Sequence, residues 1–283
     1  MSYLEEKALM AQEMRQQAAR EAAEAGFAHT LAITVAYNGT RFAGFARQAE
    51  EHVITVQGEV EGALALLYKR EVKTVCAGRT DAGVHAREQV LSIDLTEEEF
   101  AAKTLHALQR SLNALVDDDI SISSVEEKPL GFSARFDAQW REYHYHICTD
   151  QARPVLIAPL VWHLGGVKLD VDAMNQAAQH LIGEHDFKSF CMAVSAVGKP
   201  THRNVMELEV YPETVMGTEV VTVRVVGNAF LHSMVRTIVG TLVEVGRGKR
   251  QPEWVKDVLA ACNRSAAGQN APASGLVFRH VEY

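Results

Sequence analysis

A short polar stretch, CAGRTDAGVHAREQV, lies in the first third of the chain and constrains its fold more than any other feature. The runs on either side, EVKTVCA and QVLSIDL, have the apolar, β-branched composition of strands. Gly78 and Gly83 bracket Asp81 and permit a tight loop that turns the Asp81 side chain out of the sheet. Capping a turn is the commonest task of an aspartate in a loop. Arg79 and His85 are unnecessary for a turn, however, whereas an anionic ligand would use both.

Strand-like and helix-like patterns alternate around this loop and continue to the end of the chain. Alternating or β-branched apolar runs predict strands at residues 30–37, 120–128, 140–149, 205–213 and 219–230. Apolar residues at helical spacing predict helices at residues 55–70, 97–115, 170–183, 230–248 and 251–262. A sheet with helices packed on its outer side is the simplest arrangement of such elements. We therefore expect an α+β fold.

The chain is expected to have three parts. Residues 1–28 consist mainly of strong helix formers with few large apolar residues, which predicts a peripheral N-terminal helical extension. No low-complexity linker divides the remainder, and we place its boundary near GFSARFDAQW. This predicts an N-terminal α/β subdomain at residues 29–135, which carries the Asp81 loop, and a C-terminal α/β subdomain at residues 136–283.

Composition narrows the class of protein. With 47% hydrophobic and 23% charged residues among 283, the chain can fill a globular core. No apolar stretch approaches the roughly 18 residues of a membrane span, and the N-terminus lacks the apolar segment of a secretory signal. The four cysteines lie far apart, which favours a reduced, cytoplasmic protein. A net charge of −8 counts against a nonspecific nucleic-acid binder, although basic residues gathered in one cleft could still bind RNA.

Several common motifs are absent from the sequence. It contains no P-loop, no G-x-G-x-x-G after a strand and no H-E-x-x-H. His144 and His146 lie two apart on one face of a predicted strand, a spacing that can bind metal. A metal site needs three or four ligands, and no third ligand is apparent. We therefore predict a surface or packing role for this pair and no metal site.

Two further segments combine polar groups with regular spacing. Strand alternation in REYHYHI puts Arg141, Tyr143 and Tyr145 on one face. Tyrosines on a strand usually pack in a core, but an arginine beside them also fits a polar cleft, where a phenol can stack on a base or move a proton. In FLHSMVRTIVGTLVEVGRG, helical spacing brings Ser233 and Arg236 together with His232. Periodicity alone does not show whether these residues form an ordinary solvated helix face or whether Arg236 points at a carboxylate or phosphate.

Taken together, AGRTDAGVHA, REYHYHI and GNAFLHSMVRTIVGTLVEVGRGK closely resemble the motifs of the TruA family of tRNA pseudouridine synthases, in the same order. Further matches are YNGTRFAGF, TVQGEVEGAL, LNALVDDDI, FSARFDA, GEHDFKSF and APASGL. The resemblance extends from about residue 30 to the end of the chain.

The resemblance implies roles for individual residues. Asp81 matches the catalytic aspartate of the family, and Arg79 the position associated with RNA binding and base extrusion. Tyr143 matches the tyrosine that stacks on the target base and serves as a base for its C5 proton. Arg236 matches the arginine that pairs with the aspartate, and Leu276 falls where the family closes the uracil pocket. Three further residues are expected to bind substrate, namely Thr80, His85 and Arg141.

The resemblance also implies the reaction and its setting. The enzyme would isomerise uridine to pseudouridine at tRNA positions 38 to 40, in the anticodon stem-loop, without cofactor or metal. The family forms two α/β halves around a long, mainly antiparallel sheet, and acts as a homodimer in which one tRNA contacts both subunits. The basic residues that could line an RNA surface are Arg41, Arg47, Arg110, Arg247, Lys249 and Arg250. The alternatives are a tRNA-binding protein without turnover and the same chemistry on another RNA.

The chain departs from the family pattern at several positions. Asn38 stands where aspartate is usual, and Phe45 and Ala46 stand where Trp-Gln is usual. Ser233 replaces a histidine, and LNALVDDDI lacks a proline often found before the acidic pair. We expect positions 38, 45 and 46 to touch substrate or to support the Asp81 loop, so these departures bear on affinity and target range.

Overall fold

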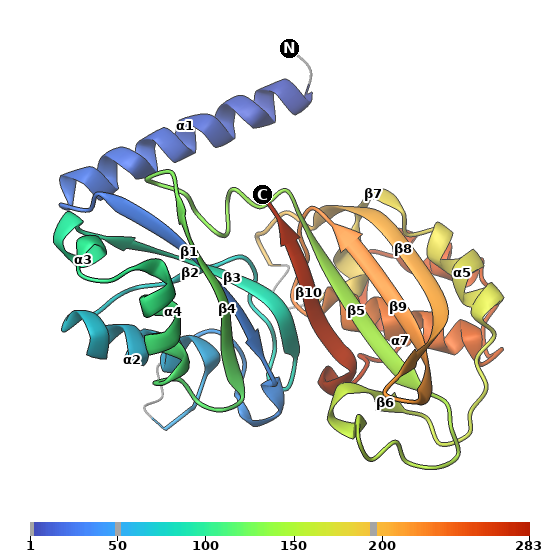
Figure 1. The fold of residues 1–283 in the computed structure, drawn as a ribbon. Helices are drawn as coiled ribbons and strands as arrows, with labels where there is room; N and C mark the ends of the chain where they lie inside the picture. Colours follow the sequence, from blue (N-terminus) through green and yellow to red (C-terminus); the bar gives the residue numbers. More distant parts are fainter. Residues whose placement is uncertain (1–2, 49–51, 193–196) are drawn as a thin grey trace. The chain divides into compact units, whose positions relative to one another are not determined.

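The computed structural model describes residues 3–48, 52–192 and 197–283, with side chains from residue 12 onward. The chain divides into two compact units, one of residues 1–139 with 281–283 and one of residues 140–280. Figure 1 shows both units, with labels on many of their helices and strands.

Four strands of the first unit form an antiparallel sheet. They are β1 (His29–Tyr37), β2 (Val75–Cys76), β3 (His85–Leu95) and β4 (Ile120–Lys128). Their order is β4-β1-β3, with β2 on β3. Ile33 of β1 lies opposite Leu91 of β3 and Val125 of β4, and all three side chains are buried. This apolar row fixes the register, because a slip by one residue would turn it to the other face.

The helices of the first unit are α1 (Tyr3–Glu24), α2 (Val56–Tyr68), α3 (Glu97–Ala101) and α4 (Leu105–Asn113), with the short 3₁₀ helix η1 (Gly39–Arg41). The single helix expected over residues 97–115 is wrong, because two helices occupy this segment. Thr96 begins the first with a reciprocal capping box to Glu99. Thr104 begins the second by accepting a hydrogen bond from the Ala107 N–H. A second N-cap within the apolar pattern starts a new helix in a new direction.

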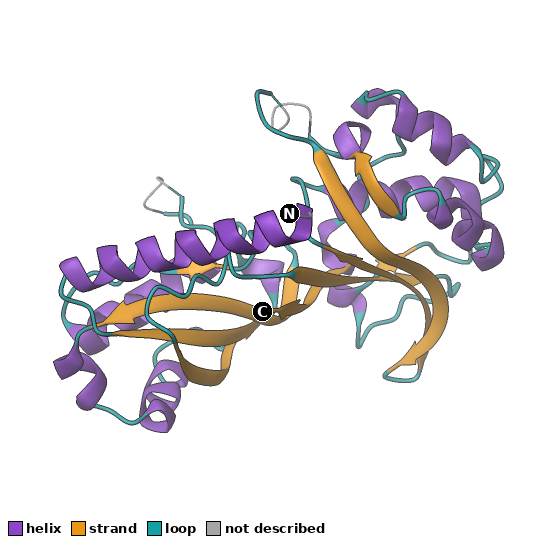
Figure 2. Cartoon of the chain, turned by 90° about the horizontal axis from the view of Figure 1, so that it is seen from above, coloured by secondary structure: helices purple, strands orange, loops and turns teal. Residues whose placement is uncertain are grey.

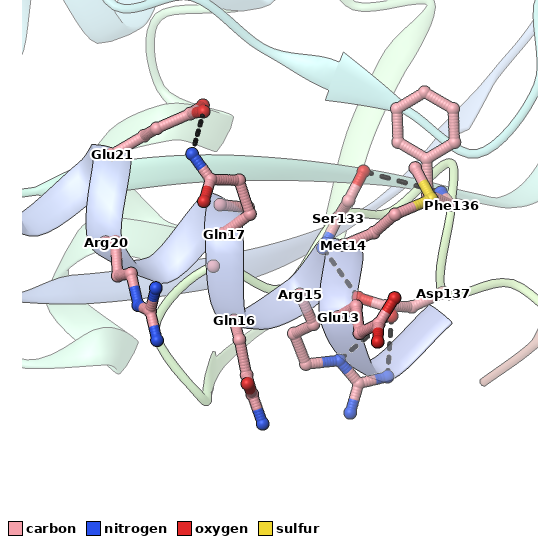
Figure 3. A pocket seen from close by; sticks show the side chains of 12 residues that line it. Glu13, Met14, Arg15, Gln16, Gln17, Arg20, Glu21, Ser133, Phe136 and Asp137 are labelled. Atoms are coloured by element: carbon pink, nitrogen blue, oxygen red, sulfur yellow. Dashed lines mark hydrogen bonds and ion pairs between the residues drawn. The ribbon is translucent and has the colours of Figure 1, made fainter. Parts of the chain in front are cut away.

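Helix α1 is docked along the segment of residues 131–137. Arg15 forms an ion pair with Asp137, whose other carboxylate oxygen accepts the Ser133 N–H at 2.8 Å. Gly131 has φ +84°, and a Cβ placed there would lie 2.5 Å from the Ala19 backbone nitrogen. The backbones at Gly131 and Ala19 therefore lie so close together that only glycine fits at position 131. Figure 3 shows the groove between them, lined by Met14, Phe136 and polar side chains of α1.

The second unit also has a mainly antiparallel sheet. Its strands are β5 (Trp140–Cys148), β6 (Trp162–His163), β7 (Gly183–Asp186), β8 (His202–Val215), β9 (Thr218–Gly227) and β10 (Leu276–Glu282). They follow the order β10-β5-β9-β8-β7, with β6 parallel to the end of β5. Met216 and Gly217 join β8 to β9 with positive φ at both residues, the two-residue turn that suits a twisted hairpin.

The helices of this unit are α5 (Val171–Gln179), α7 (Met234–Gly246) and α8 (Trp254–Ala260), with short 3₁₀ helices η2 (Ala158–Leu160), η3 (Phe187–Phe190), η4 (Arg264–Ala266) and η5 (Ala273–Gly275). In Figure 2 the α-helices of this second unit lie on one side of its strands. The expected start of the 230–248 helix is wrong, because α7 begins only at Met234 and the preceding Ser233 is left-handed (φ 58°). Each unit combines a mainly antiparallel sheet with helices, so the expected α+β class is confirmed.

Candidate active site

The Asp81 loop is a tight turn between β2 and β3. The Val84 N–H donates to the Asp81 carbonyl at 3.2 Å, which makes Asp81 the first residue of a four-residue turn. Gly83 is the third residue of this turn and has φ +78°. A turn with positive φ at its third residue requires glycine or asparagine there. The expectation of a glycine-dependent tight loop around Asp81 is therefore confirmed.

Two buried side chains from the sheet support this loop. Gln89 of β3 is fully buried and donates from Nε2 to the Gly78 carbonyl at 2.6 Å. The hydroxyl of Tyr37 in β1 lies 2.7 Å from the hydroxyl of Thr80. Burial raises the pKa of Tyr37, so the phenol is neutral at physiological pH. Thr80, a predicted substrate-binding residue, directly precedes Asp81. The Tyr37 hydroxyl holds it against the sheet.

His85 is buried at the start of β3 and contacts the η1 segment. Its Nδ1 accepts a hydrogen bond from the Gly39 N–H at 3.1 Å. Gly39 itself lies so close to β3 that a Cβ would be 1.9 Å from the Val84 carbonyl oxygen. Asn38 caps η1 by accepting bonds from the N–H and hydroxyl of Thr40. His85 therefore ties η1 to the strand that follows the Asp81 turn, and Asn38 caps η1.

Phe45 supports the same loop from within the core. Its side chain is fully buried, and its ring centroid lies 6.0 Å from that of Tyr37. Its backbone N–H donates to the Thr80 carbonyl at 3.1 Å. Of the two roles expected for position 45, the structure favours support of the loop over contact with substrate.

Two exposed arginines lie near Cys76, at the start of the loop. Arg79 is exposed, as is Arg135 from the FSARFDA segment. Burial raises the pKa of the Cys76 thiol, and the positive charges of Arg79 and Arg135 oppose this rise, so both guanidinium groups lie near it. Sequence analysis did not select Arg135, although it lies in a motif that carried the family resemblance. Two exposed arginines near the same thiol suit an anionic substrate.

In the second unit, Tyr143 lies on β5 between two aromatic rings. It makes edge-to-face contacts with Phe230 at 5.1 Å and with Phe278 at 5.0 Å between ring centroids. The burial of alternate residues confirms that Arg141 and Tyr143 share a face of the strand. Arg141 is buried and donates to the Asn228 carbonyl at 2.7 Å. Neither phenylalanine was predicted, because each comes from a separate segment.

Arg236 lies in the first turn of α7 and is fixed to the segment before β10. Its Nε donates to the Ala271 carbonyl at 2.8 Å, and its own carbonyl accepts the Ala271 N–H at 3.1 Å. Burial raises the pKa of Tyr145, and the positive charge of Arg236 opposes this rise. Leu276 is buried at the start of β10. His232 and Ser233 precede α7, so these two residues do not lie on a helical face with Arg236.

The predicted site residues fall into two groups. Arg79, Thr80, Asp81 and His85 belong to the first unit, and Arg141, Tyr143, Arg236 and Leu276 to the second. Several of the basic residues expected at an RNA surface have partners. Arg41 pairs with Asp117 and Asp119, Arg47 with Glu61, and Lys249 with Glu244. Arg247 and Arg250 lie over Trp162 and Trp254.

Among the described residues, no helix has both the length and the apolar character needed to span a bilayer.

Comparisons with known proteins agree with the motifs. The family model described as tRNA pseudouridine synthase matches residues 33–137 and 177–283. A protein of Brevibacillus brevis named tRNA pseudouridine synthase A is 45% identical over 254 residues, covering 89% of this chain and 99% of that protein. Proteins of the same name from Anoxybacillus flavithermus and Bacillus pumilus are 42% and 41% identical, and each match covers at least 88% of this chain and 97% of the relative.

Among solved structures, a Cbf5-Nop10-Gar1 complex aligns with 75% of this chain and 45% of that chain at 16% identity. The TM-score of 0.34 is too low to bear on the fold. The family model alone covers well over half of the chain, and the relatives match nearly their full lengths. The chain therefore belongs to the tRNA pseudouridine synthase family.

Proposed function

We propose that the chain isomerises uridine to pseudouridine at tRNA positions 38 to 40, in the anticodon stem-loop, with Asp81 as its catalytic group. Membership of the family makes it an isomerase. The observation that carries the role of Asp81 is the construction of its loop. A glycine turn, the Tyr37 hydroxyl and the Gln89 amide all fix the backbone around this one carboxylate. An aspartate whose only task was to cap its own turn would not require this support.

The reaction conserves every atom of the nucleotide. The bond between C1′ and N1 breaks, uracil turns, and a bond forms between C1′ and C5; the C5 proton leaves and N1 gains one. Three courses are available to the Asp81 carboxylate: addition to the base, attack on C1′ or removal of a ribose proton. A base within a stem-loop must be extruded first, and stacking on an aromatic side chain offsets part of that cost.

The remaining site residues would position the nucleotide and its phosphates. Tyr143, fixed between two phenylalanine rings, would stack on the extruded base and accept the C5 proton. Arg236 would stabilise the charge of the catalytic aspartate. Leu276 would close the uracil pocket, and Arg79 would contact phosphate during extrusion. Thr80, His85 and Arg141 would complete the substrate-binding set, with Thr80 and His85 acting through the loop that they support.

The test is tritium release from tRNA transcripts labelled at C5 of uridine. The parent should release tritium, and Asp81→Ala should release none while binding tRNA with similar affinity. Transcripts that retain a single uridine at position 38, 39 or 40 would identify the targets. Release from uridines elsewhere in the transcript would contradict the proposed positions.

A tRNA-binding protein without turnover is the alternative, since Asn38, Phe45 and Ala46 depart from the family pattern. Tight tRNA binding by the parent without tritium release would favour it. The family's homodimer, with one tRNA on both subunits, and a cytoplasmic location are part of the same proposal. A monomeric mass by light scattering, with and without tRNA, would contradict the dimer.

A further inference from the structure

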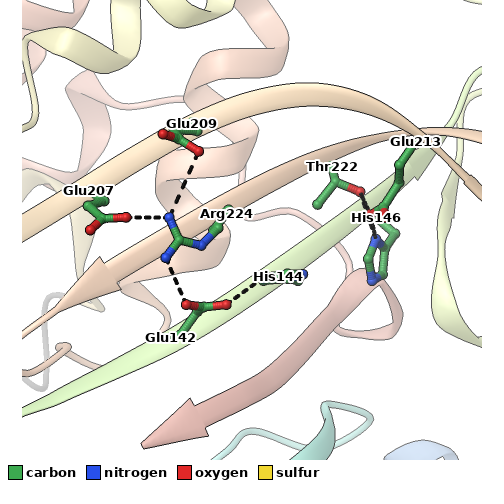
Figure 4. A network of polar contacts seen from close by, with 8 residues as sticks. All are labelled: Glu142, His144, His146, Glu207, Glu209, Glu213, Thr222 and Arg224. Atoms are coloured by element: carbon green, nitrogen blue, oxygen red, sulfur yellow. Dashed lines mark hydrogen bonds and ion pairs between the residues drawn. The ribbon is translucent and has the colours of Figure 1, made fainter. Parts of the chain in front are cut away.

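A polar network covers the face of the second unit's sheet that the proposed reaction does not use. Tyr143 and Tyr145 are buried on one face of β5, and the alternating residues of the strand point to the other. Figure 4 shows this network across three adjacent strands. Its members are Glu142, His144 and His146 of β5, Thr222 and Arg224 of β9, and Glu207, Glu209 and Glu213 of β8.

Three members of the network could bind one metal ion. Each of His144, His146 and Glu213 offers a ligand atom, and these atoms all lie within 4.8 Å of one another. Ligand atoms of a tetrahedral site with bonds of about 2.1 Å lie roughly 3.4 Å apart. Small side-chain rotations are therefore enough to bring all three onto one ion. Sequence spacing showed only the two histidines, because Glu213 follows 67 positions after His146.

The hairpin of β8 and β9 supplies the third ligand. Its turn sets the register that places Tyr211 opposite Thr222, and Glu213 lies two residues farther along the same face. The Thr222 hydroxyl donates to Glu213 and lies 2.9 Å from Nδ1 of His146. One hydroxyl thus holds a carboxylate and an imidazole from two different strands at the same place.

Glu142 prepares His144 for coordination. Its Oε1 lies 2.8 Å from Nε2 of His144. A metal-binding histidine usually donates one ring N–H to a carboxylate, which fixes the ring and makes its other nitrogen a better ligand. The other oxygen of Glu142, Oε2, accepts a hydrogen bond from Nη2 of Arg224 at 2.9 Å, which holds the carboxylate in place beside His144.

The surroundings favour a cation. A single guanidinium, that of Arg224, pairs with three carboxylates, those of Glu142, Glu207 and Glu209. A fourth carboxylate, that of Glu213, lies 3.6 Å from Nδ1 of His146. The side chains of His144 and His146 are only 17% and 15% exposed. A small apolar cluster containing Cys148 and Val220 adjoins them on the same face. Partial burial strengthens the attraction between an ion and this excess negative charge.

We propose that His144, His146 and Glu213 bind a divalent transition-metal ion of the zinc class, with water completing the coordination. Two imidazoles and one carboxylate suit such an ion, whereas Mg²⁺ and Ca²⁺ prefer oxygen ligands alone. The ion would join β5 to the β8–β9 hairpin and stabilise the second unit. The site is independent of the proposed isomerisation, which uses the opposite face of β5.

The test is a Co²⁺ titration of the untagged, metal-stripped chain, followed by displacement with Zn²⁺. We expect one Co²⁺ per chain, with the visible absorption of a low-coordinate site and no sulfur-to-metal charge-transfer band. Glu213→Gln and His146→Gln should each weaken binding at least 10-fold, and Glu142→Gln about 10-fold or more. His106→Gln, which removes an exposed histidine in the first unit, is the matched control and should bind as the parent does.

Stability provides a second readout. A saturating concentration of Zn²⁺ should raise the thermal midpoint of the parent and of His106→Gln by several degrees, and should leave Glu213→Gln unchanged. Equal midpoints of all variants without metal would show that each is folded. The proposal is overturned if the parent binds no Co²⁺, if Glu213→Gln binds it as tightly as the parent, or if a sulfur charge-transfer band places the ion on cysteine.

Discussion

The hydroxyl oxygens of Tyr37 and Thr80 lie 2.7 Å apart in the core of the first unit, and this contact joins β1 to the residue before Asp81. Gln89 makes a second connection, from β3 to the Gly78 carbonyl. The position of Asp81 therefore depends on two buried side chains of the sheet that bind the residues before it in the loop. Catalytic groups act well only when held within a fraction of an ångström of their working position.

Tyr37→Phe tests this dependence. The change removes one partner of a buried hydrogen bond and should lower the free energy of unfolding by about 1–2 kcal/mol. The freed Thr80 should also loosen the turn, so we expect kcat for tritium release to fall several-fold with KM for tRNA little changed. Tyr283→Phe, which loses a hydroxyl bond to the Ala134 carbonyl, is the matched control. A similar fall in kcat for both variants would contradict a specific role of the Tyr37–Thr80 contact.

Gly39→Ala should damage the same loop from its other side. The added Cβ would lie 1.9 Å from the Val84 carbonyl oxygen, and backbone must move to accommodate it. We expect a loss of about 2–3 kcal/mol in unfolding free energy and at least a tenfold loss of activity, because Val84 closes the Asp81 turn. Gly62→Ala in α2 meets no atom within 4 Å and should stabilise the chain by about 0.5–1 kcal/mol. Urea denaturation measures the unfolding free energies of both variants. Equal midpoints for Gly39→Ala and Gly62→Ala would contradict the prediction.

Tyr143→Phe separates the two roles proposed for the phenol. The ring should keep its place between Phe230 and Phe278, so affinity for tRNA should change by less than about twofold. Loss of the hydroxyl should slow release of the C5 proton by about 10²-fold or more if it accepts that proton. Single-turnover tritium release alongside filter binding would decide this. Unchanged release would limit Tyr143 to stacking.

His29 should make stability depend on pH. A hydrogen bond to Glu127 raises the pKa of His29; burial opposes the rise, and Glu97 adds to it. A raised folded pKa means that the stabilisation is fully present below the unfolded pKa of about 6.5 and is lost as pH rises through the folded value. Urea midpoints should therefore fall across this interval in the parent and change less in His29→Gln. His106→Gln should follow the parent, and equal slopes in the parent and His29→Gln would exclude the contribution.

Gly131→Ala should release α1. Its Cβ would lie 2.5 Å from the Ala19 backbone nitrogen, at a φ that alanine disfavours. Amides of residues 12–24 should then exchange with solvent several-fold faster in hydrogen-exchange mass spectrometry, while β1 and β3 stay protected. Arg15→Gln, which removes the ion pair with Asp137, should produce a smaller increase. Unchanged exchange of α1 in Gly131→Ala would show that this approach does not dock the helix.

Local patterns predicted much of the fold correctly. Strand alternation placed Arg141 and Tyr143 on one buried face, and Gly83 identified the turn at Asp81, since both depend only on residues close in sequence. Helix limits were less predictable. An apolar period does not show that Thr104 begins a second helix or that Ser233 adopts a left-handed conformation before α7, because caps compete with the periodic pattern that surrounds them.

The sequence by itself determined the family, the Asp81 turn and the alternation of β5, because motif and period are properties of neighbouring residues. Only the tertiary structure decided which distant side chains complete each site. Tyr37 and Gln89 reach the Asp81 loop through strand pairing, and Glu213 joins His144 and His146 through the register of the hairpin. Such pairings depend on long-range hydrogen-bond registry and on burial of a whole sheet face, and neither is expressed in the local order of residues.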